Sequence, residues 1–364
     1  MLTAFDLFGF GDREVLSVIR TVKDATDLSQ LNLMRQEVER ALKVLIPEGV
    51  TASRACKTLS DFMDKVVKRI IWFAEEACGP PPCRYAWLGL GSEGRQEQTL
   101  HTDQDNAIIF KDPVNDRTKE YFMRLSERIV KGLNECGIPL CKGNVMATNP
   151  KFFGTMSQWK NRLGCWIDNI SFSEAELMDT YIFLDFRCIY GDQFLEKELR
   201  QYMNESIEKN PSFLKSLAEN IVSVPMPIGI FKPFIVEKTG RYKDRLNIKL
   251  YGLVPLVTCI KILSLQNGLT ETNTLKRIEG LTERKIISPD QKDALEQAFE
   301  TLLTLKIQNS LVDFDQMKEF GNHINPASLS LRQTQLLKEA FCTVSELQKK
   351  TKEALKIEEN RGRW

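Results

Sequence analysis

Two short apolar runs, separated by a glycine-serine pair and two acids at alternate positions, constrain the fold of this 364-residue chain more than any other pattern. The first run, RYAWLGLG (84–91), is aromatic and aliphatic and ends in glycine, and the second is TDQDNAIIF (102–110). Short runs of this kind next to glycine are typical of buried strands. We therefore expect two strands here, with a turn or a helix start at Gly91-Ser92 and the acids on the second strand.

Helical patterns lie on both sides of these strands. Residues 13–78 repeat apolar residues at spacings of three and four, as amphipathic helices do. The segment CGPPPC (78–83) ends that pattern, because three prolines cannot continue a helix. Helical patterns return from about residue 194. The sequence thus predicts an α+β protein with a mixed α/β core, flanked by N-terminal helices (1–80) and followed by a C-terminal helical domain. The core spans 81–200 and that last domain 201–364.

Further elements follow from local patterns. Aromatic and β-branched residues in TYIFLDFRCIYGD (180–192) predict a strand, and residues 138–147 predict a strand or a hairpin. Asp112-Pro113 is typical of a helix start, so we expect a helix from Pro113 towards Cys136. A further helix is expected over 155–167. Serine followed three residues later by glutamate or glutamine predicts helix caps at Ser173, Ser288 and Ser330.

Composition excludes several classes of protein. The net charge of +1 gives no field for nucleic acid or a membrane surface, so we expect neither as a partner. The longest apolar run (250–260) is too short for a transmembrane helix, and acids at positions 6, 12 and 14 argue against a signal peptide. Nine cysteines without C-x-x-C spacing indicate reduced thiols, a cytoplasmic location and no zinc motif. With two histidines, catalysis must depend on carboxylates, lysines, arginines or metals.

The acids in TDQD are the first candidates for a metal site. Residues i and i+2 of a strand point to the same face, so Asp103 and Asp105 would project side by side. Mg²⁺ prefers one or two carboxylates together with phosphate oxygens and water. We therefore expect Asp103 and Asp105 to bind Mg²⁺, with Mn²⁺ as an alternative ion. A second Asp-x-Asp, at Asp313 and Asp315, lies in a helical pattern, where such residues diverge, and is interpreted as a solvated helix face.

The turn before these acids has the residue types that bind phosphate. Glycine at Gly91 lets the backbone approach an anion, and Ser92 adds a hydroxyl. Arg95, one turn further on, can make bidentate contacts with phosphate, and Glu97 could orient it. The alternative is that Gly91-Ser92 is a plain hairpin and Arg95 a surface charge.

Asp185 is the candidate for a third carboxylate. It stands in an otherwise apolar segment, where a lone carboxylate is costly unless it is paired or bound to metal. Two-metal sites use such a carboxylate to hold the second ion or to accept a proton. The alternative is a salt bridge with Arg187, its neighbour on the same face of the expected strand.

Other candidates stay open between two interpretations. Asn144 either binds the ribose or base of a nucleotide or forms a turn. Lys249, in a basic cluster before an apolar helix, either lies over the triphosphate or starts a solvated helix. His101 is a candidate proton shuttle or a loop histidine.

Taken together, GLGSEGRQEQTLHTDQDNAIIF (89–110) resembles the metal-binding motif of the DNA polymerase β-like nucleotidyltransferase superfamily. The chain is similar to the nucleotidyltransferase family of bacterial signalling proteins, and through it to PII uridylyltransferases and glutamine-synthetase adenylyltransferases. The segments GNVMATNP (143–150) and LDFRCIYGD (184–192) match that family, and residues 244–265 match its helical C-terminal substrate domain. The resemblance covers residues from about 13 to 350.

The resemblance implies roles for individual residues. Gly91 and Ser92 would contact the nucleotide phosphates, Asp103 and Asp105 would bind Mg²⁺, and Asp185 would be the third catalytic carboxylate. We further expect Arg95, Asn144, Arg187 and Lys249 to contact the nucleotide.

The implied reaction moves a nucleoside monophosphate from a nucleoside triphosphate to an acceptor hydroxyl and releases pyrophosphate. The acceptor is unknown and could be a protein, in signalling or regulation; a homodimer is left open. The alternative is a catalytically inactive regulatory module that binds Mg-nucleotide.

Overall fold

The structure is a computed structural model, and it describes residues 17–46, 49–100, 102–168, 172–229, 234–315 and 321–358. The chain forms two compact units. The first contains Met1–Leu163 and Asp179–Tyr202, and the second contains Gly164–Met178 and Met203–Trp364. The predicted boundaries at residues 80 and 200 stay predictions.

A four-stranded mixed sheet forms the centre of the first unit. Its strands are β1 (Tyr85–Gly89), β2 (Asn106–Phe110), β3 (Phe153–Thr155) and β4 (Arg187–Gly191), in the order β3-β2-β1-β4. Strand β1 runs antiparallel to β2 and to β4, whereas β2 and β3 are parallel. Every residue of β1 and β2 is buried, which explains their continuous apolar runs.

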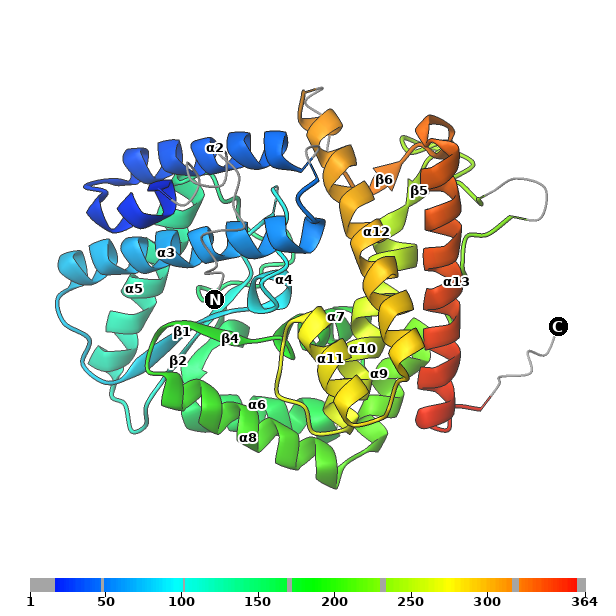
Figure 1. Ribbon diagram of the computed structural model, residues 1–364. Helices are drawn as coiled ribbons and strands as arrows, with labels where there is room; N and C mark the ends of the chain where they lie inside the picture. The colour runs from blue at the N-terminus through cyan, green and yellow to red at the C-terminus, as the bar shows by residue number, and fades with distance from the viewer. Residues whose placement is uncertain are drawn as a thin grey trace, which may run out of the picture. The chain divides into compact units, whose positions relative to one another are not determined.

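Helices cover this sheet (Figure 1). Helix α3 (Ala52–Cys78) packs against β4 and against α5 (Asp116–Glu135). From α6 (Met156–Asp168), the Trp159 indole N–H donates to the carbonyl of Ile108 on β2 at 3.0 Å. The other elements of this part of the chain are η1 (Val22–Asp24), α2 (Leu28–Leu45), α4 (Gly91–Gly94), η2 (Pro150–Phe152), α7 (Glu174–Phe183) and α8 (Gln193–Lys209). The predicted α+β class is confirmed.

The predicted strand over 180–192 is wrong in its first part. Residues up to Phe183 finish α7, and β4 begins only at Arg187. The cap at Ser173 explains this: its hydroxyl accepts from the Glu176 N–H, and the glutamate carboxylate accepts from the serine N–H, so a helix starts here. Once begun, that helix overrides the strand propensity of TYIF.

Three other expectations need correction. The strand β2 begins at Asn106, so the two acids precede it instead of lying on it. Residues 138–147 form turns, not a strand or a hairpin. Helix α5 begins at Asp116, with Asn115 as its N-cap, whereas Asp112 accepts from the Ser157 N–H at the start of α6. The pair Asp112-Pro113 was therefore assigned to the wrong helix.

Helices make up most of the second unit, as expected. Ser288 and Ser330 each form the predicted reciprocal cap, with Gln291 and Gln333. A short ribbon pairs β5 with β6 in antiparallel register. From residue 203 onward the second unit contains α9 (Ser212–Val222), β5 (Leu246–Asn247), η3 (Lys249–Leu253), α10 (Val254–Gln266), α11 (Thr274–Glu283), α12 (Pro289–Asp315), β6 (His323–Ile324), η4 (Pro326–Ser328) and α13 (Leu331–Ala354).

The segment Lys249–Gln266 is more apolar and longer than we expected. Among the described residues it is the one helical stretch that could cross a membrane by length and composition, but 72% of it is buried inside the protein. Its α10 part packs against α9, α11 and α13, and every residue from Pro255 to Leu265 is buried. We therefore assign α10 as the core helix of the second unit.

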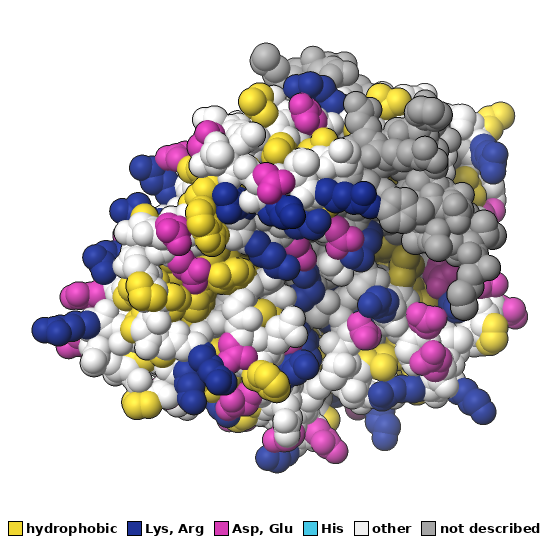
Figure 2. Space-filling view, turned by 60° about the vertical axis from the view of Figure 1, so that its left-hand side comes forward, with side chains coloured by type: hydrophobic (Ala, Val, Ile, Leu, Met, Phe, Trp, Pro, Cys, Tyr) yellow, Lys and Arg dark blue, Asp and Glu magenta, His cyan; other side chains and the backbone are white. Residues whose placement is uncertain are grey.

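The face drawn in Figure 2 mixes basic and acidic side chains. Dark blue and magenta groups are interspersed across its described part, as a net charge of +1 suggests. A nucleic-acid groove needs a stripe of one sign. The expectation that nucleic acid is not a partner stays a prediction.

Candidate active site

The turn after β1 lies directly against Asp105. The backbone N–H of Leu90 donates to the Asp105 carbonyl at 2.9 Å, and Gly91 follows with a left-handed φ of 50°. A Cβ on Gly91 would lie 3.3 Å from the Asp105 carboxylate oxygen Oδ2. Glycine therefore lets the left-handed turn pass close to the acid, where a side chain would crowd the carboxylate.

Side chains of the segment before β2 alternate between two sides of the backbone. Asp103 and Asp105 are half-buried, whereas Gln104 and Asn106 between and after them are almost fully buried. An extended backbone alternates its side chains in this way even outside a strand. The predicted pairing of the two acids therefore holds although neither lies on β2.

The buried amides fix the loop 138–147 beside this segment. The Gln104 amide donates to the carbonyls of Val130 and Ile138, both at 3.2 Å. The Asn106 side-chain oxygen accepts from the Ala147 N–H at 2.8 Å. These hydrogen bonds replace the strand pairing that we expected for the loop, and they bring its cysteine to the acids.

Cys141 completes a group of three donor atoms that could hold a metal ion. One oxygen each of Asp103 and Asp105 and the Cys141 sulfur all lie within 4.8 Å of one another. Burial raises the pKa of the Cys141 thiol to about 12, and the negative charge of Asp105 adds to the effect. Sequence reasoning missed Cys141, because a single cysteine in a loop carries no spacing signal.

These residues fit a divalent cation. Two carboxylates are the protein ligands that Mg²⁺ or Mn²⁺ commonly takes, with the remaining positions left to phosphate and water. At Gly91 the backbone of the turn lies next to the Asp105 carboxylate, and a glycine backbone can approach a phosphate closely. The Cys141 sulfur is a softer ligand than Mg²⁺ prefers, so it would favour softer metal ions, which the two carboxylates alone would not.

Asp185 is completely buried and pairs with Arg95. The Arg95 Nη1 lies 2.6 Å from an Asp185 oxygen, and its Nε lies 2.7 Å from Glu97. The proposed alternative, a salt bridge with Arg187, is wrong about the partner. Glu97 does orient Arg95, as suggested, and the two carboxylates raise the pKa of Arg95 although burial alone lowers it.

Gly94 lets the turn and the Asp185 segment touch. A Cβ on Gly94 would lie 1.8 Å from the Asp185 carbonyl oxygen, a distance that no side chain can occupy. The backbone of α4 is therefore in direct contact with that of Asp185, two residues before β4. Asp185 thus belongs to the surroundings of the turn, although it is not among the three donor atoms that lie within 4.8 Å of one another.

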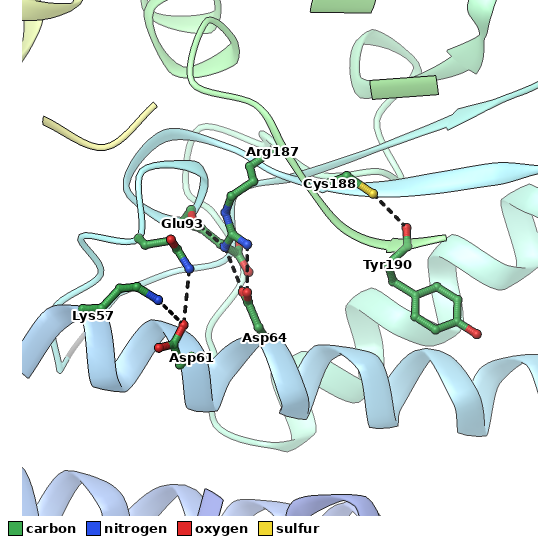
Figure 3. A network of polar contacts seen from close by, with 8 residues as sticks. Lys57, Asp61, Asp64, Glu93, Arg187, Cys188 and Tyr190 are labelled. Carbon is green, nitrogen blue, oxygen red and sulfur yellow. Dashed lines mark hydrogen bonds and ion pairs between the residues drawn. The ribbon is translucent and has the colours of Figure 1, made fainter. Parts of the chain in front are cut away.

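Arg187 is held by helix α3 (Figure 3). Its two terminal nitrogens each lie 2.8 Å from an Asp64 oxygen, and Nη2 also donates to the Glu93 carbonyl at 3.1 Å. A bidentate pair of this kind is strong and directional. Asp64 was not predicted from sequence, and only its place on the buried side of an amphipathic helix could have indicated it.

Glu93 is a buried acid beside this pair. Burial raises its pKa to about 8, the negative charges of Asp64 and Asp105 add to the increase, and Arg187 opposes it. One turn earlier on α3, Asp61 accepts from the Gln96 amide at 3.3 Å and pairs with Lys57 (Figure 3). Helix α3 therefore contacts the turn at two points.

The other predicted residues lie as follows. Ser92 is half-buried within α4. Asn144 is exposed in a turn, with a left-handed φ of 56°, and its carbonyl accepts from the Asn149 amide. Lys249 is exposed at the start of η3, in the second unit. His101 lies outside the described residues, and so do the side chains of Asp313 and Asp315.

Comparison with known protein families agrees with this site. The model "Putative nucleotidyltransferase DUF294" matches residues 36–172, and "Putative nucleotidyltransferase substrate binding domain" matches residues 211–355. No curated protein matches the chain. The first match contains the turn, the acids and Cys141, and the two together span most of the sequence. The chain therefore belongs to this nucleotidyltransferase family, with its substrate-binding domain following the nucleotidyltransferase domain.

Proposed function

We propose that the chain transfers a nucleoside monophosphate from a nucleoside triphosphate to an acceptor hydroxyl. One observation carries the proposal: the Asp103 and Asp105 oxygens lie within 4.8 Å of each other, and the Gly91 turn lies against Asp105. A candidate cation site and a glycine turn thus occur together. Family membership supports the same chemistry.

In this reaction the acceptor oxygen forms a bond to the α-phosphorus while the bond from that phosphorus to the β-phosphate oxygen breaks. Pyrophosphate leaves, and a base takes the acceptor proton. Divalent ions, Mg²⁺ or Mn²⁺, would neutralise the triphosphate and activate the acceptor hydroxyl. Asp103 and Asp105 hold the ion, and Gly91 and Ser92 contact the phosphates.

Asp185 is the proposed third carboxylate of the reaction. In the absence of nucleotide Arg95 neutralises it, which a fully buried carboxylate requires. In the reaction Arg95 would contact the phosphate, and Asp185 would hold the second ion or take the acceptor proton. Arg187, Asn144 and Lys249 are the further proposed nucleotide contacts.

The acceptor is the less defined part of the proposal. The substrate-binding domain named by the second family match would select it. A protein hydroxyl in a regulatory or signalling role, in the cytoplasm, is the proposed acceptor; assembly as a homodimer is compatible with it.

The test uses the full chain with Mg²⁺ and each of the four α-³²P-labelled nucleoside triphosphates, with a cell lysate as the source of acceptor. We expect label on an acceptor and release of pyrophosphate, both lost in Asp103→Asn. The matched control is Asp313→Asn in the second Asp-x-Asp, which should keep both.

Nucleotide binding without pyrophosphate release, under every acceptor tried, would instead support an inactive regulatory module. Equal transfer by Asp103→Asn and the unmodified chain would refute the assignment of the site. The first outcome would show that the proposed reaction is wrong, and the second that the proposed site is wrong.

A further inference from the structure

Cys141 is the residue of the site that the proposed reaction does not use. Its sulfur lies within 4.8 Å of the oxygens of Asp103 and Asp105 that face it. A two-carboxylate site for Mg²⁺ needs no thiol, and Mg²⁺ has little affinity for sulfur. The thiol therefore requires a separate explanation.

The position of Cys141 is fixed by structure around it. Its loop is attached by the Gln104 N–H, which donates to the Pro139 carbonyl at 3.0 Å, and by the Asn106 N–H, which donates to that of Val145 at 3.1 Å. Both donors alternate with the acids along the chain. The backbone that presents the carboxylates thus also holds the segment that presents the sulfur.

We propose that Cys141 is a third protein ligand of this site, through which it takes a thiophilic divalent cation such as Zn²⁺ or Co²⁺ in competition with Mg²⁺. The inference rests on the proposed function, because it concerns the same cation site. Thiolate ligands favour Zn²⁺ and related ions, whereas carboxylates alone also suit Mg²⁺ and Mn²⁺.

Binding of such an ion converts the thiol to a thiolate. The sulfur–metal bond forms, the sulfur–hydrogen bond breaks, and the proton passes to solvent. The reaction involves no oxidation or reduction. Mg²⁺, which leaves the thiol protonated, would be held by the two carboxylates alone.

The experiment titrates the metal-free full chain with Co²⁺, because a thiolate ligand gives cobalt a near-ultraviolet charge-transfer band that carboxylates do not give. Calorimetry with Zn²⁺ and with Mg²⁺ then measures the affinities. The variants are Cys141→Ser, Cys141→Ala and Asp103→Asn. The control is Cys165→Ser, which removes an exposed thiol of the second unit.

We expect the band in the unmodified chain and in Cys165→Ser, and its loss in both Cys141 variants. Zn²⁺ affinity should fall at least tenfold in the Cys141 variants, since even outer partners of a metal site contribute about 10- to 100-fold. The ratio of Zn²⁺ to Mg²⁺ affinity should fall with it. Circular dichroism is used to check that the Cys141 variants are folded.

An unchanged band and Zn²⁺ affinity in a folded Cys141 variant would overturn the inference. If Asp103→Asn nevertheless weakens Mg²⁺ binding, the proposed function survives that result. If Asp103→Asn changes the binding of no cation, the acids are not a metal site, and the proposed function falls together with the inference.

Discussion

The segment before β2 and the segment before β4 both present acids near the same turn, but in opposite surroundings. Asp103 and Asp105 are half-buried and lie close to each other and to Cys141, and Asp105 also lies against the Gly91 turn. Asp185 is fully buried and is bonded to Arg95 at 2.6 Å. The first segment is arranged for a ligand that arrives from solution, whereas the charge in the second is already neutralised by the protein.

The acids of the two segments look alike in the sequence, but they contribute differently to ligand binding and to stability. Acids that face each other repel until a cation binds, so they cost stability and support binding. An acid paired inside the protein contributes to the fold, because removing it leaves a buried cation. Substitutions in the first segment should therefore act mainly on activity, and those in the second on stability as well as activity.

The largest effect is expected in the first segment, on activity. Asp103→Asn or Asp105→Asn should lower nucleotidyl transfer about 10³-fold, which corresponds to about 4 kcal/mol in the barrier. For Asp103→Asn the free energy of unfolding should change by less than about 0.5 kcal/mol, as for other partly exposed positions. Transfer assays and urea denaturation measure the two quantities. A large loss of stability here would erase the contrast.

Asp185→Ala should lower stability in addition to transfer. Leaving Arg95 without this carboxylate should lower the free energy of unfolding by about 3–5 kcal/mol, as for other broken buried pairs. Asp185→Asn, which keeps a hydrogen-bond acceptor for Arg95, serves as the milder comparison and should cost less. A stability within 1 kcal/mol of the unmodified chain, measured by urea denaturation, would show that the pair is dispensable.

Gly94→Ala tests the contact between the turn and the second segment. The new Cβ would have to displace the Asp185 carbonyl, 1.8 Å away, so we expect a loss of about 3 kcal/mol or more in the free energy of unfolding. Gly143→Ala is the matched control, because the nearest atoms to its Cβ are 3.7 Å away. Thermal unfolding of the two variants side by side gives the answer, and equal midpoints would contradict the expectation.

The contact between Asp64 of α3 and Arg187 should contribute less to the free energy of unfolding. Asp64→Asn removes the charge opposite Arg187 and should cost about 2 kcal/mol in urea denaturation, in the range for hydrogen bonds to charged groups. Asp61→Asn, on the same helix, removes an exposed pair with Lys57 and should cost no more than about 0.5 kcal/mol. Similar losses of stability in the two variants would mean that the bidentate geometry of the Asp64–Arg187 pair contributes nothing to stability.

A separate, pH-dependent effect is expected from Glu93. Its pKa is raised to about 8 in the folded protein, above the ordinary 4.5, so the folded state holds a proton that the unfolded state has lost. Stability should therefore decline as the pH rises from about 4.5 to about 8, by at most about 1.4 kcal/mol per pH unit. Urea denaturation across that range should show a shallower slope in Glu93→Gln. A slope that Glu93→Gln leaves unchanged would assign it to other groups.

Local patterns were enough to predict part of the site. The two buried strands, the glycine turn, the helix caps and the orienting role of Glu97 all depend on residues close together in the sequence, where periodicity and capping rules apply. The side-by-side acids were predicted for the same reason, since an extended backbone alternates its side chains whether or not it pairs.

Contacts between distant segments could not be predicted in this way. Arg95 pairs with Asp185 and Arg187 with Asp64, and neither partner is marked by spacing. Cys141 reaches the acids because the Gln104 amide binds two carbonyls of other segments, a role that sequence does not distinguish from that of a surface glutamine. The strand predicted over 180–186 failed because a helix start several residues earlier outweighed local propensity.

Helix α3 has a practical consequence for dividing the chain. Near the middle of the helix Asp64 holds Arg187, and further along both Glu75 oxygens accept tyrosine hydroxyls, from Tyr85 of β1 and Tyr190 of β4. At about 1.5 Å per residue these two anchor points are about 16 Å apart along the helix axis. A fragment that begins at residue 81, among the prolines, would lack helix α3, which packs against β4 and α5. Expression of the first unit alone should start ahead of Ala52.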